Sequence, residues 1–282
     1  MMEPPDAAFA PILAALDAAF LVHRESAAAS TRPFVTLTYA QSLDGSIAGE
    51  PGKPLRLSGC ESMRMTHMLR AWHDSILVGV GTVATDDPSL TVRLCAGDHP
   101  LPVVLDPTLR TPPGCKLLTS SSCRRPVIAT TLAGVGAAER RAELERAGAS
   151  ILVCESEPDS HRINMADLMP RLAAAHGASR VMVEGGAGVI TSLLAHDGRA
   201  LAAGAPPLLS TLVLTIAPTL VGGVRAVQGL LPPNGALAFP RLAAPVYARA
   251  GDDVVVQGTW AVAEGSPSST EAGRVRATLG AL

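Results

Sequence analysis

Two short segments rich in glycine and acidic residues carry the clearest chemical signal in the sequence. The first is Gly185-Gly186-Ala187-Gly188-Val189, which follows the apolar run of residues 181–183 and Glu184 and precedes an apolar helix predicted over 189–195. Glycines let the backbone approach an anion closely, and the first turn of a helix offers unpaired N–H groups. The third glycine of the dinucleotide fingerprint is missing. The residues alone therefore favour a phosphate cradle and a purely structural turn about equally.

The second segment is Asp86-Asp87-Pro88, which follows Gly79-Val-Gly-Thr82. Its hydroxyl and carboxylate groups could hydrogen-bond a ligand. Asp and Pro also routinely end a helix and begin a turn, and the residues alone favour that plainer interpretation.

Three arginines, Arg56, Arg70 and Arg93, surround the same stretch and could bind a phosphate through charge-assisted hydrogen bonds. Arg70 lies off the apolar stripe of its predicted helix, which leaves it free to reach either a ligand or solvent. His67 and His73 are six residues apart, which is not a metal-ligand spacing on one helical face, so we predict no metal site. The motifs of zinc deaminases, serine hydrolases and P-loop proteins are not present in the sequence.

A strand–helix–strand unit between residues 34 and 93 must position these groups. Residues 34–39 alternate as a half-buried strand does, and residues 75–80 form a short buried strand that a glycine-rich turn ends. Ser58 and Glu61 have the capping-box spacing, so the helix is predicted to begin at Ser58. Its apolar face is formed by Met65, Met68, Leu69 and Trp72. Ligands gather at the carboxyl ends of strands in such units, which predicts a site near residues 79–93.

The rest of the chain alternates short strands with helices. This pattern predicts one α/β domain with a mainly parallel central sheet, flanking helices and an antiparallel C-terminal edge. Residues 198–209 are predicted to form a flexible loop, and residues 247–250 and 254–262 an antiparallel pair.

Composition excludes several classes of function. The 282 residues are 48% hydrophobic and carry a net charge of −2 without runs of like charge, which argues against nucleic acid or an anionic membrane as the main partner. Five cysteines without a CxxC pair indicate a reducing compartment, and we expect a cytoplasmic protein. Glu3 and Asp6 precede the apolar segment 7–22, so we predict an amphipathic helix there rather than a targeting peptide or a membrane span.

Taken together, the motifs are more specific than any one of them. TLTYAQSLDGSIA, MLRAWHDSILVGVGTVATDDPSLTVR, PVVLDP, VMVEGGAGVI and LTIAPTLVGG occur in this order. Over residues 32–262 the series resembles the reductase of riboflavin biosynthesis, a family with a dihydrofolate-reductase-like fold. The chain accordingly divides into an N-terminal helix and linker (1–31), a reductase domain (32–263) and a tail expected to be disordered (264–282).

The resemblance implies a homodimeric enzyme that uses NADPH to reduce the ribosyl group of a pyrimidine ribosylamine 5′-phosphate to a ribityl chain. It places the substrate against Arg70, Leu90, Arg93 and Glu184. It places NADPH against the two glycine- and aspartate-containing segments described above and against one residue outside them. These cofactor residues are Thr82, Asp86, Gly185, Gly186, Ala187, Gly188, Val189 and, as the weaker match, Ala40.

The first motif, TYAQSLDG, resembles the fungal and eukaryotic branch of stand-alone enzymes, which act on the 2,5-diamino pyrimidinone before deamination. Three alternatives stay open: reduction of the deaminated pyrimidine, a dihydrofolate reductase, and a catalytically silent nucleotide-binding relative. The arginines on the substrate side disfavour the second of these. Glu184 is a candidate proton donor, but we favour a role in substrate binding for it, or water as the donor.

Overall fold

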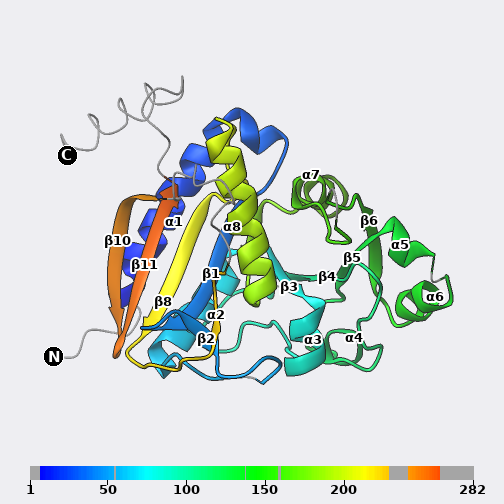
Figure 1. Cartoon of the computed structure of the whole chain (residues 1–282), viewed down its shortest axis with the longest axis horizontal. Coiled ribbons are helices and arrows are strands. Elements are labelled where there is room, and N and C mark those ends of the chain that lie inside the picture. Colours follow the sequence, from blue (N-terminus) through cyan, green and yellow to red (C-terminus); the bar gives the residue numbers. More distant parts are fainter. Residues whose placement is uncertain (1–6, 54, 137, 158–159, 229–240, 261–282) are drawn as a thin grey trace.

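The computed structural model describes residues 7–260, apart from 54, 137, 158–159 and 229–240. Within that part, nine strands form one sheet in the order β10-β11-β8-β1-β7-β3-β4-β5-β6 (Figure 1). The strands from β8 to β6 run parallel, and β11 and β10 add an antiparallel edge. This arrangement confirms the predicted fold class. The predicted tail, residues 264–282, lies outside the described residues.

The strands of the main sheet are β1 (Phe34–Ser42), β3 (Ser75–Gly79), β4 (Leu101–Leu105), β5 (Val127–Thr131), β6 (Ser150–Cys154), β7 (Arg180–Val183), β8 (Thr211–Ala217), β10 (Leu242–Ala250) and β11 (Asp253–Trp260). A separate two-stranded sheet pairs β2 (Ser46–Ala48) with β9 (Val224–Arg225). The helices are α1 (Ala10–Glu25), α2 (Cys60–Trp72), α3 (Val80–Asp86), α4 (Lys116–Thr119), α5 (Leu132–Val135), α6 (Ala138–Arg146), α7 (Met165–His176) and α8 (Ala187–Ala202).

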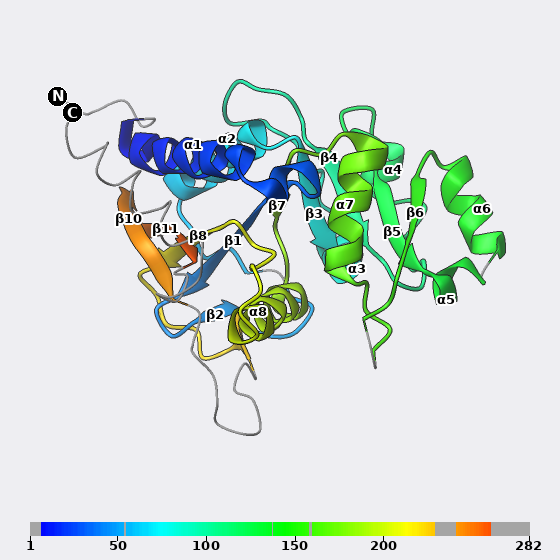
Figure 2. The same cartoon turned by 90° about the horizontal axis from the view of Figure 1, so that it is seen from above.

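Helices cover both faces of the sheet and create two apolar cores. On one face α1, α2 and α6 pack against the sheet, through residues such as Leu16, Leu69 and Leu144. On the other face α7 and α8 do so, through residues such as Leu172 and Ile190. Figure 2 shows α1 and α2 on the opposite side of the sheet from α8. Burial on both faces explains the continuous apolar runs of β3, β4 and β7. The half-buried strand predicted over residues 34–39 is wrong for the same reason, since residues 34–38 of β1 are all buried and their threonines lie inside the protein.

The N-terminal helix belongs to the first of these cores. Phe9, Ile12 and Leu16 are buried in it, and α1 contacts β10 and β11. Among the described residues, Ala7–Glu25 is the one segment that is long and apolar enough to cross a membrane by length and composition alone. Its buried stripe is the packing of an amphipathic helix that covers a sheet. The division at residue 31 remains a prediction.

Two local predictions around the strand–helix–strand unit are wrong. The expected glycine-rich turn after β3 is the short helix α3, because Val80 and Val83 lie three residues apart and both pack into the core. Helix α2 begins at Cys60 and lacks the predicted capping box. Its cap comes from Asp253, whose carboxylate accepts hydrogen bonds from the Gly59 N–H (2.8 Å) and the Ser62 hydroxyl (2.6 Å).

The loop predicted over residues 198–209 is also partly wrong, since α8 continues to Ala202. One internal glycine, Gly198, costs a helix only about 1 kcal/mol. Asp197 compensates, because its carboxylate accepts the N–H groups of Leu208 (2.8 Å) and Leu209 (3.0 Å) and the indole N–H of Trp260 (3.0 Å). A buried carboxylate therefore holds both the helix and the segment that follows it.

His73, at the end of α2, predicts a stability that falls in mild acid. Its ring is 3% exposed, donates from Nδ1 to the carbonyl of Leu69 (2.7 Å) and has Nε2 within 2.7 Å of the Thr36 hydroxyl. Burial lowers the pKa of His73 to about 3. The unfolded chain binds a proton here below about pH 6.5 and the folded chain does not, so stability falls as the pH drops below that value.

At pH 5 this single group should cost about 2 kcal/mol of folding free energy relative to pH 7. Urea unfolding of the native protein and of His73→Gln at both pH values measures it. The loss between pH 7 and pH 5 should be about 2 kcal/mol smaller in the variant, and an equal loss in both proteins would contradict the assignment.

Candidate functional site

The two segments singled out in the sequence meet at the carboxyl ends of β3 and β7. These strands are neighbours, with Leu77 paired to Val183, so the residues that follow them emerge side by side. A Cβ placed on Gly79 would lie 3.2 Å from Cγ2 of Val189. A Cβ placed on Gly186 would lie 3.8 Å from the Thr82 hydroxyl. The start of α3 and the start of α8 therefore face one another across a short gap.

A cavity of about 640 Å³ opens between these segments. Six of the predicted cofactor residues line it, whereas Gly185 and Ala40 are not among its lining residues. The six are Thr82, Asp86, Gly186, Ala187, Gly188 and Val189. A third wall is formed by Ile47 and Ala48 of β2, by residues 51–53 and Leu55, and by Val224 of β9.

The glycine turn before α8 has both a structural and a binding role. Gly185 is needed for packing, since a Cβ there would lie 2.7 Å from Cβ of Val189. A side chain at Gly188 would have open space, and a Cβ at Gly186 would be in ordinary van der Waals contact with the Thr82 hydroxyl, so both glycines leave the cavity clear. Gly186 is the N-cap of α8 and, in the described structure, no side chain caps this helix. The N–H groups of its first turn can therefore bind an anion in the cavity.

Arg70 and Glu184 form an ion pair beside this turn. The Arg70 Nε and Nη2 atoms each donate to one Glu184 carboxylate oxygen, both at 2.7 Å, and Nη1 donates to the carbonyl of Thr91 (3.2 Å). The side chains are 11% and 20% exposed. Burial alone would lower the pKa of Arg70, but the Glu184 carboxylate outweighs it and raises that pKa. Arg70 is thus held against the end of β7. The sequence had predicted only that it is free to reach a ligand or solvent.

The remaining predicted substrate residues follow α3. Arg93 donates from Nη1 to the Thr91 hydroxyl (2.6 Å) and lines a second cavity, of about 680 Å³, on the far side of the loop before α2. The Leu90 side chain is buried in the core and its φ of 52° is left-handed, so only its backbone is placed to meet a ligand. Ala40 lies in β1, paired with Thr215 of β8, and is half-buried.

Sequence reasoning overlooked two residues that shape the site. His67 was considered only as a metal ligand, yet its Nδ1 accepts the backbone N–H of Arg93 (2.9 Å). Burial first, and then Arg70 and Arg93, lower the pKa of His67 to about 4, which keeps that acceptor neutral at physiological pH. No local signal in the sequence pairs the two positions.

Asp44 is the second. Its carboxylate accepts hydrogen bonds from the hydroxyls of Ser42 (2.5 Å) and Ser46 (2.9 Å) and from the N–H groups of Val221 (3.0 Å) and Gly222 (2.8 Å). The Ser42 hydroxyl and then these N–H groups lower the pKa of Asp44 well below its usual value. The carboxylate thereby joins the turn after β1 to the segment that carries Val224, a wall of the cavity. In the sequence, the signals for this contact were the Asp44-Gly45 turn and the later Gly222-Gly223 pair.

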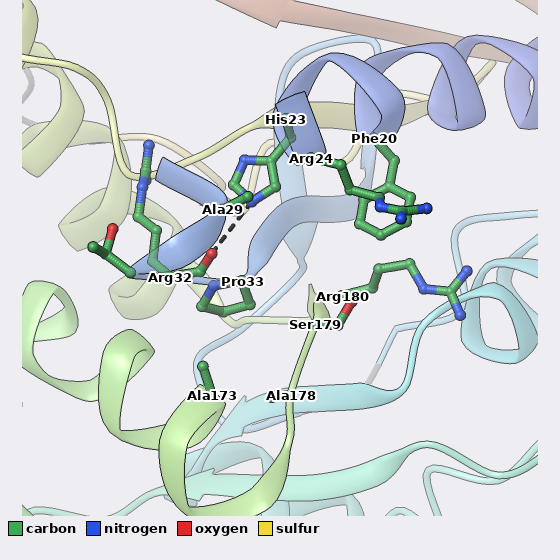
Figure 3. A pocket seen from close by; sticks show the side chains of 11 residues that line it. Phe20, His23, Arg24, Ala29, Arg32, Pro33, Ala173, Ala178, Ser179 and Arg180 are labelled. Atoms are coloured by element: carbon green, nitrogen blue, oxygen red, sulfur yellow. Dashed lines mark hydrogen bonds between the residues drawn. The ribbon is translucent and has the colours of Figure 1, made fainter. Parts of the chain in front are cut away.

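A further cavity, of about 560 Å³, lies at the opposite, amino ends of β1 and β7 (Figure 3). It contains Arg24, Arg32 and Arg180 and lies where α1 and α7 end. Cations at helix C-termini complement the helix dipole, and the Arg180 guanidinium stacks over the rings of Trp72 (4.8 Å) and Phe20 (5.5 Å). These arginines thus have structural roles, and ligands of parallel sheets bind at the other end of the strands.

Comparisons with known proteins agree on one family. Residues 33–256 match the family model described as the RibD C-terminal domain. Over 201 residues the chain is 33% identical to the 2,5-diamino-6-ribosylamino-4(3H)-pyrimidinone 5′-phosphate reductase of Debaryomyces hansenii, a match covering 68% of this chain and 78% of that protein. The reductase of the same name from Methanothermobacter thermautotrophicus is 36% identical over 198 residues, covering 68% and 81%.

Solved structures give the same picture. The riboflavin biosynthesis reductase of Saccharomyces cerevisiae superposes with a TM-score of 0.60 at 28% identity, covering 82% of this chain and 91% of that chain. RibD of Acinetobacter baumannii superposes with a TM-score of 0.65 at 21% identity, covering 88% and 62%, and at that identity it shows a shared fold alone.

Proposed function

The chain belongs to the family of RibD C-terminal domains, and from that premise we propose that it is the NADPH-dependent reductase of 2,5-diamino-6-ribosylamino-4(3H)-pyrimidinone 5′-phosphate in riboflavin biosynthesis. The reaction converts the ribosyl group to a ribityl chain: a hydride adds to carbon 1 of the opened sugar, and a proton neutralises the sugar oxygen released from that carbon. The observation that carries the proposal is the convergence of the α3 and α8 segments on one cavity.

A nicotinamide dinucleotide fits this cavity in size and in chemistry. Its volume of about 640 Å³ is within the usual range for small-molecule sites. The first turn of α8 is suited to the diphosphate, and Thr82 and Asp86 on the facing wall can hydrogen-bond ribose hydroxyls. Lys53 lies in the same lining, with its ammonium group paired to Glu50 (2.8 Å). When bound, the reduced nicotinamide supplies the hydride.

The substrate is best placed at the end of β7, next to the glycine turn. There the Arg70–Glu184 pair joins α2 to β7 and presents fixed polar groups beside the cofactor cavity. Both oxygens of Glu184 accept hydrogen bonds from Arg70, so this carboxylate is suited to orient the substrate. Because both oxygens of Glu184 are bound by Arg70, we assign the proton to water rather than to this carboxylate. Holding the two reactants in this relation is the enzyme's main contribution to the rate.

Oxidation of NADPH, followed at 340 nm with purified protein, tests the proposal. We expect kcat/KM for the diamino substrate to exceed that for deaminated 5-amino-6-(5-phosphoribosylamino)uracil by at least about tenfold, and no turnover of dihydrofolate. Higher kcat/KM with the deaminated compound would assign that substrate instead. No oxidation with either pyrimidine would leave a silent nucleotide-binding relative. NADH in place of NADPH measures the preference between the two cofactors.

We further propose that the enzyme is a homodimer that associates through the antiparallel edge of the sheet. The register aligns Tyr247, Val256 and Leu214 in one row across β10, β11 and β8, and Val254 with Ile216 in the next row. Tyr247 and Val254 are 65% and 43% exposed. Val255, which points the other way, lies in the core that α1 covers. An apolar sheet face of this kind is typical of a contact with a second copy.

A charge on this face should separate the copies. We expect Val254→Glu to halve the molar mass measured by light scattering at micromolar concentration, because it buries a carboxylate against apolar side chains. Val22→Glu is the matched control, since Val22 is 59% exposed on the opposite face, on α1, and that variant should remain dimeric. A monomeric native protein, or a dimeric Val254→Glu variant, would contradict the proposed interface.

A further inference from the structure

The cavity of about 680 Å³ beside the cofactor cleft has a strongly positive lining. It lies between the loop that precedes α2 and the segment that follows Thr91. Arg56, Arg64 and Arg93 line it, and its one carboxylate belongs to Glu61. The Glu61 carboxylate lies close to Gly251 in the turn between β10 and β11, because a Cβ on that glycine would meet it at 2.8 Å. The lining therefore carries a net positive charge.

Two of these arginines keep their charge unneutralised. In the described part of the chain neither Arg56 nor Arg93 forms an ion pair. Arg56 donates to the Cys60 sulfur (3.5 Å) and Arg93 to the Thr91 hydroxyl (2.6 Å), both neutral acceptors. Arg70 differs, since Glu184 takes two of its N–H groups. Two unneutralised guanidinium groups on one cavity make it attractive to a dianion, which each can bind in a bidentate fashion.

The position of this cavity relates it to the cofactor cleft. Leu55 lines the cleft and Arg56 lines the cavity, so one loop separates the two spaces. Thr91 connects the cavity to the ion pair, because its hydroxyl accepts from Arg93 and its carbonyl from Arg70. A substrate whose reacting carbon lies next to the glycine turn would thus extend past Arg70 and Glu184 toward Arg56 and Arg93.

The backbone at Arg93 is held in place by a buried side chain. His67 is 1% exposed, and its Nδ1 accepts the Arg93 N–H at 2.9 Å. The backbone of Arg93 is therefore fixed, and the residue is exposed, as Arg56 is. Arg56 lies on the loop before α2 and can approach a ligand from the other side of the cavity.

We propose that Arg56 is a substrate-binding residue that, opposite Arg93, holds the phosphate monoester at the far end of the substrate. This inference rests on the proposed function, which supplies a substrate with a 5′-phosphate. It deepens that function by assigning the phosphate to a cavity separate from the one that holds the cofactor diphosphate. A dianionic phosphate matches the two guanidinium groups in charge, and a neutral sugar gains nothing from them.

The test compares Arg56→Gln with native enzyme on the phosphorylated substrate and on the same compound without its phosphate. We expect KM for the phosphorylated substrate to rise about tenfold, which is typical of one lost charge-assisted hydrogen bond. The values of kcat and of KM for NADPH should stay within about twofold, and kcat/KM for the dephosphorylated compound should not change. Arg56→Lys keeps the positive charge but cannot form two parallel hydrogen bonds, so its KM for the phosphorylated substrate should lie between those of the native enzyme and Arg56→Gln. Arg124→Gln, an exposed arginine that donates to the His99 carbonyl, controls for loss of one positive charge.

Binding of ribose 5-phosphate and of ribose, measured by calorimetry, separates this inference from the proposed function. If the native protein oxidises no NADPH but Arg56→Gln weakens ribose 5-phosphate about tenfold, the function fails and the phosphate site stands. If turnover is normal while Arg56→Gln leaves KM unchanged, or raises it equally for the dephosphorylated compound, Arg56 does not bind the phosphate. A melting temperature within about 2 °C of native shows that the variant is folded.

Discussion

Gly186→Asp is expected to leave the protein as stable as the native chain and to weaken NADPH binding by roughly 100-fold. Aspartate is a favoured N-cap residue and its charge complements the α8 dipole, so the folded state should gain a few tenths of a kcal/mol if anything. The same carboxylate points into the cavity, beside the position proposed for the diphosphate. Two like charges about 5 Å apart at an effective dielectric constant near 20 repel by roughly 3 kcal/mol, which is about a hundredfold in affinity.

Gly186→Asn is the matched control, because asparagine has the same shape and a similar preference for the N-cap without the charge. Its effect on NADPH affinity should be no more than about fivefold. Calorimetric titration gives both dissociation constants, and thermal unfolding gives the stabilities. If Asp and Asn weakened binding equally, the defect would be steric and the diphosphate would lie elsewhere.

Glu184→Ala is expected to reduce kcat/KM for the pyrimidine substrate by about 100-fold and to destabilise the fold by about 3 kcal/mol. The stability loss follows because a largely buried guanidinium loses its partner. The loss of activity follows because the group that orients the substrate beside the cofactor is removed. NADPH affinity should change by less than about twofold, since Glu184 does not line the cofactor cavity.

The double variant Arg70→Met/Glu184→Met separates the two effects. It removes both charges, so it should recover most of the stability that Glu184→Ala loses, while its activity should remain low. Steady-state kinetics and urea unfolding of the three proteins provide the comparison. Recovery of activity together with stability would mean that the pair serves the fold alone.

The regular elements that build the site were predictable because each has a local cause. Buried parallel strands appear in the sequence as apolar runs. The glycine segment between β7 and α8 indicated where a strand ends and where the next helix begins. Because β3 and β7 are adjacent and parallel, the site then follows from where the chain leaves them. The residues on both walls of the cavity between α3 and α8 could therefore be named from the sequence, and their role in binding NADPH stays a prediction.

What could not be predicted depends on contacts between distant residues. The cap of α2 comes from Asp253, nearly two hundred residues away, so the local Ser58–Glu61 spacing misled. The prediction that Arg70 lies off the apolar stripe of its helix was correct. Its partner, Glu184, could not be predicted because it is 114 residues further along the chain. Helix periodicity predicts the direction of a side chain but does not identify the residue that it contacts.

A crystal structure of the protein with NADPH at saturating concentration tests the central claim most directly. We predict the diphosphate within hydrogen-bonding distance of the N–H groups of residues 186–188, with Thr82 and Asp86 against the same cofactor molecule. A cofactor bound at any other place on the molecule, with the space between α3 and α8 empty, would contradict it.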